Sequence, residues 1–357
     1  MAEVFDKPVQ HPCVWRASDP GLEKSITWHL TGDDRDEILS AMRAVVARQT
    51  RYQEVTRADF ELPSLGPKLE EVCRDVAHGR GIAIVKGFPV ENLTVAEIEV
   101  MYWCLGLFFG KAVSQSVMGD LIGHVTDVSG KDPNERAYRN SLELPLHTDL
   151  SDMIAMLSIR ASKEGGLSLY SSVAAVHNEL LASNPELLPP LYHGYRMHRF
   201  GEQAPGEPPV TAHRVPVLSE RDGFVSARIV PEYIDMAEVE LGEPMAAIDR
   251  QAVDTFLATA MRHDICLRVM LEPGDLSVIN NYAVLHARTL FNDFVEPERK
   301  RLLLRLWLDG YDRRPVHEDA FDVSRGGIAQ QKDRDSSYFD GDTARRANRG
   351  RYGEASN

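Results

Sequence analysis

The sequence predicts an α+β protein with a jelly-roll barrel of the cupin type at its core and α-helices packed around it. The first observation is a series of short apolar runs, separated by turn residues and interrupted by segments of helical periodicity. The second is a pair of distant histidine segments that could converge on one site from the strands of a barrel. Composition alone fits an α/β sheet protein nearly as well, so the histidine segments decide the prediction.

Helical periodicity is clearest in the first third of the chain. Residues 33–51 repeat apolar side chains at helical spacing and begin with aspartates, which favour a helix N-terminus. Residues 65–78 form a second such segment, which glycines end. Thr94 and Glu97 have the spacing of a capping box and predict a helix to about residue 108. Two further helices are expected at residues 173–182 and 249–262.

Apolar runs between turn signals predict the strands of the barrel. A polar loop at residues 129–140 leads into the first histidine segment. The expected β segments are residues 81–88, 113–128, 153–160, 265–271, 276–279 and 302–308, with a further strand that begins at Ser168.

The segment Leu144-Pro145-Leu146-His147-Thr148-Asp149 has the spacing of a metal-binding pair. In an extended strand, residues two apart project from the same face, so His147 and Asp149 could bind one cation together. A distant histidine would complete a set of two imidazoles and one carboxylate, which suits a non-haem Fe(II) centre with open coordination positions. His177 and Glu179 have the same spacing, but they are expected on a helix, where such residues diverge by about 200°. We assign them to a solvated helix face.

The third ligand is expected to be His286. It follows a turn signal and an apolar stretch, and an arginine-rich strand comes after it. His213, which also has arginines behind it, is the rival candidate.

Two arginines are expected to point inward from the arginine-rich strand that follows His286. Arg301 and Arg305 share one face with Leu303 and Trp307, while Leu302, Leu304 and Leu306 occupy the other face. A buried guanidinium needs an anionic partner, and its planar fork matches a carboxylate. That partner is either a dicarboxylate ligand or a protein carboxylate such as Asp275 or Asp293.

Together, His147, Asp149, His286, the segment Gly165-Gly166-Leu167-Ser168-Leu169 and the arginine strand resemble the TauD/TfdA family of Fe(II)/2-oxoglutarate dioxygenases. The resemblance covers about residues 81–309 and implies the same jelly-roll fold. It implies that the two histidines and the aspartate bind Fe(II), and that Arg301 binds the distal carboxylate of 2-oxoglutarate. Ser168 stands where many relatives have an assisting threonine.

The resemblance implies oxidation of a small organic molecule with 2-oxoglutarate and O₂ as cosubstrates, and release of succinate and CO₂. The expected reaction is hydroxylation of an unactivated C–H bond, because related halogenases lack the carboxylate that Asp149 supplies. Desaturation or cyclisation uses the same three ligands and remains open. The histidine segments would also suit a non-catalytic metal- or ligand-binding cupin, or an oxidase that does not use 2-oxoglutarate.

The substrate is expected to be a carboxylate or an amino-acid-like molecule. In taurine-type relatives the second arginine, here Arg305, binds the acidic group of the substrate. Glu143 has the strand parity of His147, and Asp152 follows the motif closely, so either could bind an ammonium group. Both could equally be ordinary solvated or loop-capping carboxylates.

Charge and cysteine usage limit the partners and the compartment. The net charge of −14 argues against nucleic acid and anionic membranes as partners, because both bind basic patches on a protein surface. The scattered cysteines and the lack of a signal-peptide pattern predict a cytoplasmic protein, and a homo-oligomer is left open. We predict an N-terminal extension with an amphipathic helix at residues 1–60, the dioxygenase domain at 61–312, and a polar C-terminal tail at 313–357.

Overall fold

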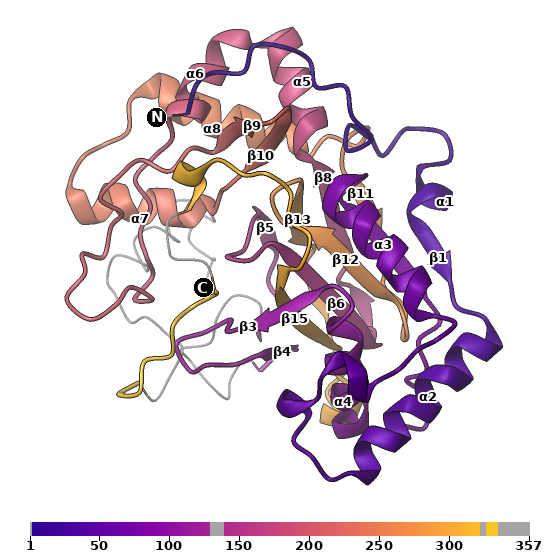
Figure 1. Ribbon diagram of the computed structural model, residues 1–357. Helices are drawn as coiled ribbons and strands as arrows, with labels where there is room; N and C mark the ends of the chain where they lie inside the picture. The colour runs from indigo at the N-terminus through magenta and orange to yellow at the C-terminus, as the bar shows by residue number, and fades with distance from the viewer. Residues whose placement is uncertain (1, 129–138, 322–325, 335–357) are drawn as a thin grey trace.

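The computed structural model describes residues 2–128, 139–321 and 326–334, and its core consists of two facing β-sheets (Figure 1). The large sheet has the strand order β1-β2-β12-β6-β15-β3, and β4 also pairs with β15. All its pairings are antiparallel except that of β1 with β2. Its strands are β1 (Thr27–His29), β2 (Ile82–Lys86), β3 (Gly110–Val113), β4 (Ile122–Val125), β6 (Met153–Arg160), β12 (Leu276–Asn280) and β15 (Leu302–Gly310).

The small sheet has the strand order β11-β8-β13-β5, and all its pairings are antiparallel. Its strands are β5 (Leu144–His147), β8 (Ser168–Ser172), β11 (Leu267–Val269) and β13 (Val284–Arg288). Two short strand pairs lie outside both sheets: β7 (Glu164–Gly165) with β14 (Phe291–Asn292), and β9 (Leu218–Arg221) with β10 (Phe224–Ala227).

Helices cover the outer face of each sheet (Figure 1). The large sheet packs against α2 (Gly32–Ala47), α3 (Gly66–His78) and α4 (Val95–Gly106). The small sheet packs against α5 (Val173–Ser183), α6 (Leu188–His193) and α8 (Ala247–Ala260). The remaining helices are α1 (Leu22–Ile26) and α7 (Pro231–Leu241). None of the described helices is long and apolar enough to cross a membrane.

Local sequence signals account for several of these boundaries. The hydroxyl of Thr94 accepts a hydrogen bond from the backbone N–H of Glu97, and the Glu97 carboxylate accepts one from the backbone N–H of Thr94, as the capping box predicted. Thr31 and Asp34 cap α2 in the same reciprocal way. Each box satisfies amide groups that the first helical turn leaves without intrahelical partners.

Strand β15 confirms the predicted alternation of faces. Leu302, Leu304, Leu306 and Leu308 belong to the apolar cluster under the helices of the large sheet. Leu303 and Trp307 belong to the cluster between the two sheets. Both faces of β15 are buried, because helices cover one face and the small sheet faces the other. The face of Leu303 and Trp307 is therefore the one that can contribute to a site between the sheets.

One sequence-based expectation, that of a solvated His177, is corrected. His177 does not lie on a solvated helix face, because it is fully buried, with its Nε2 atom 3.0 Å from the carbonyl oxygen of Phe5. The N-terminal segment covers this part of α5, and the spacing of residues along the helix does not predict such a contact. The strand expected at residues 276–279 is present as β12, and Asn281 begins a turn that carries the chain from the large sheet to the small sheet.

Described segments before β2 and after β15 pack on the core. Trp15 is buried and donates a hydrogen bond to the backbone of Arg80, and β1 extends the large sheet. Arg314 and Val316 are buried as well. Residues 129–138 of the loop expected at 129–140 lie outside the described residues, as do residues 322–325 and 335–357 of the expected tail. The division into an extension, a domain and a tail stays a prediction.

Candidate metal centre

Three side chains that could bind one metal ion meet at the end of the small sheet. The candidate ligand atoms of His147, Asp149 and His286 all lie within 4.8 Å of one another. The register of β5 and β13 pairs His147 directly with His286, and their ring centroids are 4.2 Å apart. Sheet pairing therefore brings together two histidines that are far apart in the sequence.

Asp149 lies in the turn after β5, and not on the strand itself as its spacing predicted. Asn281 holds this turn. The Asn281 side chain accepts a hydrogen bond from the backbone N–H of Asp149 and donates to the carbonyl oxygens of Asp149 and Ser151. Since Asn281 is fully buried in the turn between β12 and β13, it ties the aspartate to the segment that carries His286.

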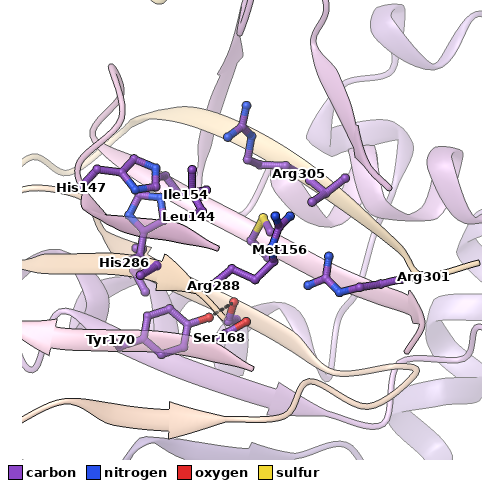
Figure 2. A pocket seen from close by; sticks show the side chains of 14 residues that line it. Leu144, His147, Ile154, Met156, Ser168, Tyr170, His286, Arg288, Arg301 and Arg305 are labelled. Atoms are coloured by element: carbon purple, nitrogen blue, oxygen red, sulfur yellow. Dashed lines mark hydrogen bonds between the residues drawn. The ribbon is translucent and has the colours of Figure 1, made fainter. Parts of the chain in front are cut away.

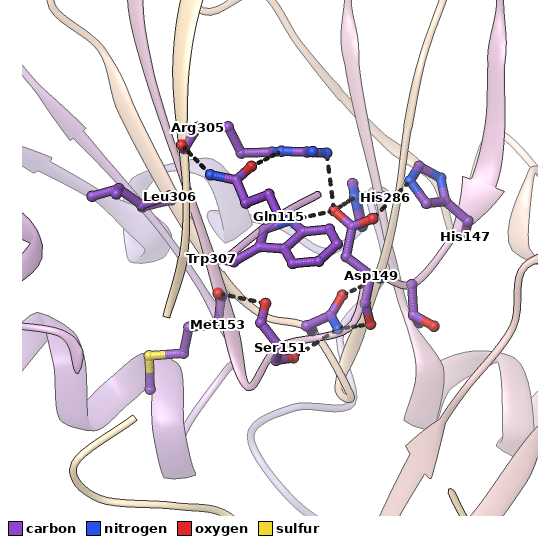
Figure 3. A network of polar contacts seen from close by, with 12 residues as sticks. Gln115, His147, Asp149, Ser151, Met153, His286, Arg305, Leu306 and Trp307 are labelled. Atoms are coloured by element: carbon purple, nitrogen blue, oxygen red, sulfur yellow. Dashed lines mark hydrogen bonds and ion pairs between the residues drawn. The ribbon is translucent and has the colours of Figure 1, made fainter. Parts of the chain in front are cut away.

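The carboxylate of Asp149 is fixed from the side of the large sheet (Figure 3). Its Oδ2 atom accepts hydrogen bonds from Nε1 of Trp307 at 2.9 Å and from Arg305 at 3.2 Å. Gln115 holds Arg305 in turn, since its amide accepts from Nε of Arg305 and donates to the Arg305 carbonyl oxygen. Burial alone would raise the pKa of Asp149, but Arg305, and then His286 and His147, hold that pKa well below its usual range. The group is a carboxylate.

The imidazole of His147 is oriented as a metal ligand requires. Its Nδ1 atom lies 2.8 Å from the carbonyl oxygen of Pro145, which can only accept, so Nδ1 carries the proton and Nε2 presents its lone pair. Burial, together with the neighbouring His286, lowers the pKa of His147 to about 3, so this ring is neutral. Nε2 of His147 lies 3.7 Å from Oδ1 of Asp149, and Nε2 of His286 lies 3.6 Å from Oδ2. Two imidazoles and one carboxylate are the donor set that suits non-haem Fe(II).

A cavity extends from the histidines between the two sheets (Figure 2). The described residues that line it include three arginines and no carboxylate. The lining residues are Val125, Leu144, His147, Ile154, Met156, Ser168, Tyr170, Ser277, Ile279, His286, Ala287, Arg288, Arg301 and Arg305. The cavity therefore joins the candidate metal centre to a cationic, partly apolar space.

Arg301 enters the cavity from the start of β15. Its side chain is buried, and no described residue accepts a hydrogen bond from its guanidinium; Nη1 in particular has no partner. The Asp293 carboxylate accepts from the backbone N–H of Arg301, and Asp275 pairs with Lys86, so neither carboxylate forms the expected pair with the Arg301 side chain. Burial, and then the charge of Arg288, lower the pKa of Arg301 to about 10.

The turn before β8 leaves room for this guanidinium. Gly166 has a φ of 76°, a conformation that favours glycine. A Cβ atom added there would lie 3.2 Å from Nε of Arg301 and 2.9 Å from the hydroxyl of Ser162. The Gly165-Gly166 pair of the sequence thus permits a close approach of backbone and arginine.

The other predicted site residues divide into those at the cavity and those away from it. Ser168 lies in the lining, near Tyr170, whose hydroxyl donates to Ser277 at 2.9 Å. Glu143 is exposed and does not line the cavity. Asp152 is occupied elsewhere, since it pairs with Arg313 at 3.0 Å and accepts from the backbone of Gly310.

His213, the rival third ligand, is exposed and is not part of the metal-ligand group.

Sequence reasoning did not assign a role to Asn281, Gln115, Trp307 or Arg288. For Trp307 and Arg288 a signal was available, because strand parity places Trp307 with Arg305 and Arg288 with His286. For Asn281 and Gln115 no periodic pattern exists. Their roles depend on contacts between segments that the sequence does not place side by side.

The chain is similar to known proteins in sequence and in fold. A family model described as "Taurine catabolism dioxygenase TauD, TfdA family" matches residues 46–307. FR-33289 synthase of Streptomyces rubellomurinus is 31% identical over 317 residues, which cover 87% of this chain and 92% of that protein. Taurine hydroxylase-like protein SAT17 of Stachybotrys chartarum is 26% identical over 293 residues, which cover 78% of this chain and 73% of that protein.

Solved structures support the jelly-roll fold. An asparagine oxygenase in complex with Fe(II), hydroxyasparagine and succinate has a TM-score of 0.62 and 18% identity, and the match covers 79% of this chain and 93% of that one. The non-heme iron oxygenase OrfP in complex with Fe and alpha-ketoglutaric acid has a TM-score of 0.61 and 13% identity, with 79% and 94% covered.

Proposed function

Because the chain belongs to the TauD/TfdA family of Fe(II)/2-oxoglutarate-dependent dioxygenases, we propose that it hydroxylates an unactivated C–H bond of a small carboxylate-bearing, amino-acid-like molecule. His147, Asp149 and His286 would bind the iron, and Arg301 with Ser168 would bind 2-oxoglutarate. The convergence of the three ligand groups at the end of a cationic cavity is the observation that carries the proposal.

When bound, the iron and 2-oxoglutarate activate O₂, and the cosubstrate leaves as succinate and CO₂ while one oxygen atom enters the substrate. The protein positions the reactants in the cavity and excludes water from it. His147, Asp149 and His286 would hold the metal at the end of the cavity. Arg305 and Trp307 hold the Asp149 carboxylate in a single orientation.

The charges of the cavity support an acidic group on the substrate. Arg305, which the sequence suggested for the acidic group, lines the cavity, whereas its described lining contains no carboxylate that could meet an ammonium group. Glu143 and Asp152, which the sequence suggested for that role, have other surroundings. The asparagine oxygenase and OrfP structures contain hydroxylated amino acids, so amino acids and their N-acylated forms belong in the first group of candidates.

The test has two steps. Anaerobic Fe(II) and 2-oxoglutarate should give the visible charge-transfer absorption of the chelate, which a storage or sensor cupin without a cosubstrate site would not show. Aerobic succinate release should then be scored against amino acids, N-acylated amino acids, simple carboxylates and sulfonates. Mass spectrometry of the product distinguishes hydroxylation, a gain of about 16 Da, from desaturation or cyclisation, a loss of about 2 Da, since the masses follow from the atoms exchanged. Failure to form the chelate would refute the proposal.

A further inference from the structure

Arg288 is a buried cation that the proposed function leaves without a role. It lies on β13, two residues after His286 and on the same face, and it lines the cavity. Its exposed fraction is 5%, close to the 4% of Arg301. Removing a guanidinium from water to this extent is unfavourable unless anions or several hydrogen bonds compensate it.

Neutral groups provide part of that compensation. Nη2 of Arg288 donates to the carbonyl oxygens of Asn140 and Leu142, at 2.8 and 2.5 Å. Its Nε atom has no hydrogen-bond partner, and no described carboxylate forms an ion pair with it. The negative charge of Asp127 acts on Arg288, but Oδ2 of Asp127 lies 3.7 Å from Nζ of Lys300. The positive charge of Arg288 is therefore not neutralised by a direct partner.

Arg288 and Arg301 approach each other from opposite sheets (Figure 2). The guanidinium carbons lie 4.9 and 5.1 Å from the centre of the same ring, Phe291. Two like charges held this close inside a protein repel each other, so the arrangement is most favourable when an anion lies between them.

The same end of the cavity contains Ser168, whose hydroxyl is expected at the cosubstrate. The register of β13 with β8 pairs Arg288 directly with Ser168, and His286 with Tyr170. A ligand that reaches Arg301 and Ser168 would therefore also reach the side chain opposite Ser168. Arg305 is not part of this group, because its guanidinium contacts Asp149 and Gln115 at the metal end.

We propose that Arg288 is a second cationic ligand of the distal carboxylate of 2-oxoglutarate, which it binds together with Arg301 and Ser168. The inference rests on the proposed function and deepens it. The carboxylate would be held between the two sheets, with Arg301 on one side and Arg288 on the other. Through the carbonyl groups of Asn140 and Leu142, the same side chain ties the cosubstrate to the segment that leads into β5.

The test is anaerobic titration of Fe(II)-loaded protein, with the chelate absorption as the measure of binding. Arg288→Met should weaken binding of 2-oxoglutarate by about tenfold or more, equivalent to about 1.4 kcal/mol. Binding of 2-oxobutyrate, which chelates through the same two groups and lacks the distal carboxylate, should change by less than about twofold. Arg288→Lys, which restores a positive charge, should recover part of the loss for 2-oxoglutarate.

Arg268→Met is the matched control. Arg268 lies on β11 of the same sheet, also donates to backbone carbonyls, and does not line the cavity. Its removal should leave both dissociation constants unchanged. If Arg288→Met does not fold, Arg288→Gln keeps amide donors for the two carbonyl groups and removes the charge, with the same expected loss.

Two results would overturn the inference. Wild-type affinity for 2-oxoglutarate in the Met or Gln variant would mean that the charge is not used. An equal loss for 2-oxoglutarate and 2-oxobutyrate would mean that Arg288 only supports the fold around the site. In both cases the wild-type protein still forms its chelate, which separates failure of this inference from failure of the proposed function.

Discussion

The two ends of the cavity differ in how their charges are balanced. At the metal end, Asp149 has Trp307 and Arg305 as direct partners, and Gln115 holds Arg305. At the other end, neither Arg301 nor Arg288 forms an ion pair with a described carboxylate. The first end is organised by the protein itself, whereas the second leaves buried positive charge for a ligand to neutralise. This contrast indicates which end binds the metal and which end binds an anion.

The largest effects are expected from the metal end. His147→Ala, Asp149→Ala and His286→Ala should each abolish succinate release, because each removes one of three ligand groups. Far-ultraviolet circular dichroism should stay normal, since the ligands form a small cluster beside a much larger apolar core. His213→Ala is the control and should retain activity. Full activity in His286→Ala, combined with its loss in His213→Ala, would show that the third ligand was misassigned.

A smaller effect is expected when a partner of the metal ligand is removed. Arg305→Leu takes away one of the two donors to Oδ2 of Asp149, and loss of such a group typically lowers metal affinity by about 10- to 100-fold. Competition with a fluorescent chelator measures this affinity. Arg313→Leu, which breaks the pair with Asp152 away from the metal, should bind iron like the wild type. Unchanged iron affinity in Arg305→Leu would contradict the claim that Arg305 organises the Asp149 carboxylate for metal binding.

Asn281→Ala should affect both stability and metal binding. The substitution leaves the backbone N–H of Asp149 and two carbonyl groups without their partner, at a cost of about 1–3 kcal/mol in the free energy of unfolding. Urea unfolding of the metal-free protein measures that cost. Asn178→Ala removes a similar side-chain clamp on the backbone of Val9, so it should lose stability without losing iron affinity. Equal iron affinity in both variants would mean that Asn281 does not position Asp149.

The smallest effect is expected at Glu143. Its strand parity suggested a contact with the substrate, but the side chain is exposed outside the cavity lining. Glu143→Gln should change kcat/KM for the substrate that the succinate screen identifies by less than about twofold, as is usual for a surface substitution. A KM raised tenfold or more would show that the substrate reaches this carboxylate.

Much of the fold and of the site could be predicted from the sequence, because both depend on periodic patterns of residues. Alternation along β15 identified the face that bears Arg305 and Trp307, and the capping box located α4. The position of a residue along a strand predicts the face on which its side chain lies, but it does not predict which residue that side chain contacts. It could not indicate that Arg305 contacts Asp149, or that β5 ends at His147 and places Asp149 in a turn.

Contacts between distant segments were beyond the reach of these patterns. A single buried asparagine such as Asn281 has no periodic signature, and its role follows from the meeting of two turns. The burial of His177 likewise depends on an N-terminal segment that has little regular structure of its own. Strand register, which pairs His147 with His286, is set by the whole sheet and not by either strand alone.

The contrast between the two ends is tested most directly by titrating 2-oxoglutarate into anaerobic Arg301→Leu and Arg305→Leu at saturating Fe(II). Truncating one partner of a desolvated charge pair typically costs about 2–5 kcal/mol. The account therefore predicts that Arg301→Leu binds 2-oxoglutarate at least about thirtyfold more weakly with normal iron affinity. Arg305→Leu should show weaker iron binding and nearly normal cosubstrate affinity once iron is saturating. Equal loss of cosubstrate affinity in both variants would contradict the division of the cavity into a metal end and an anion end.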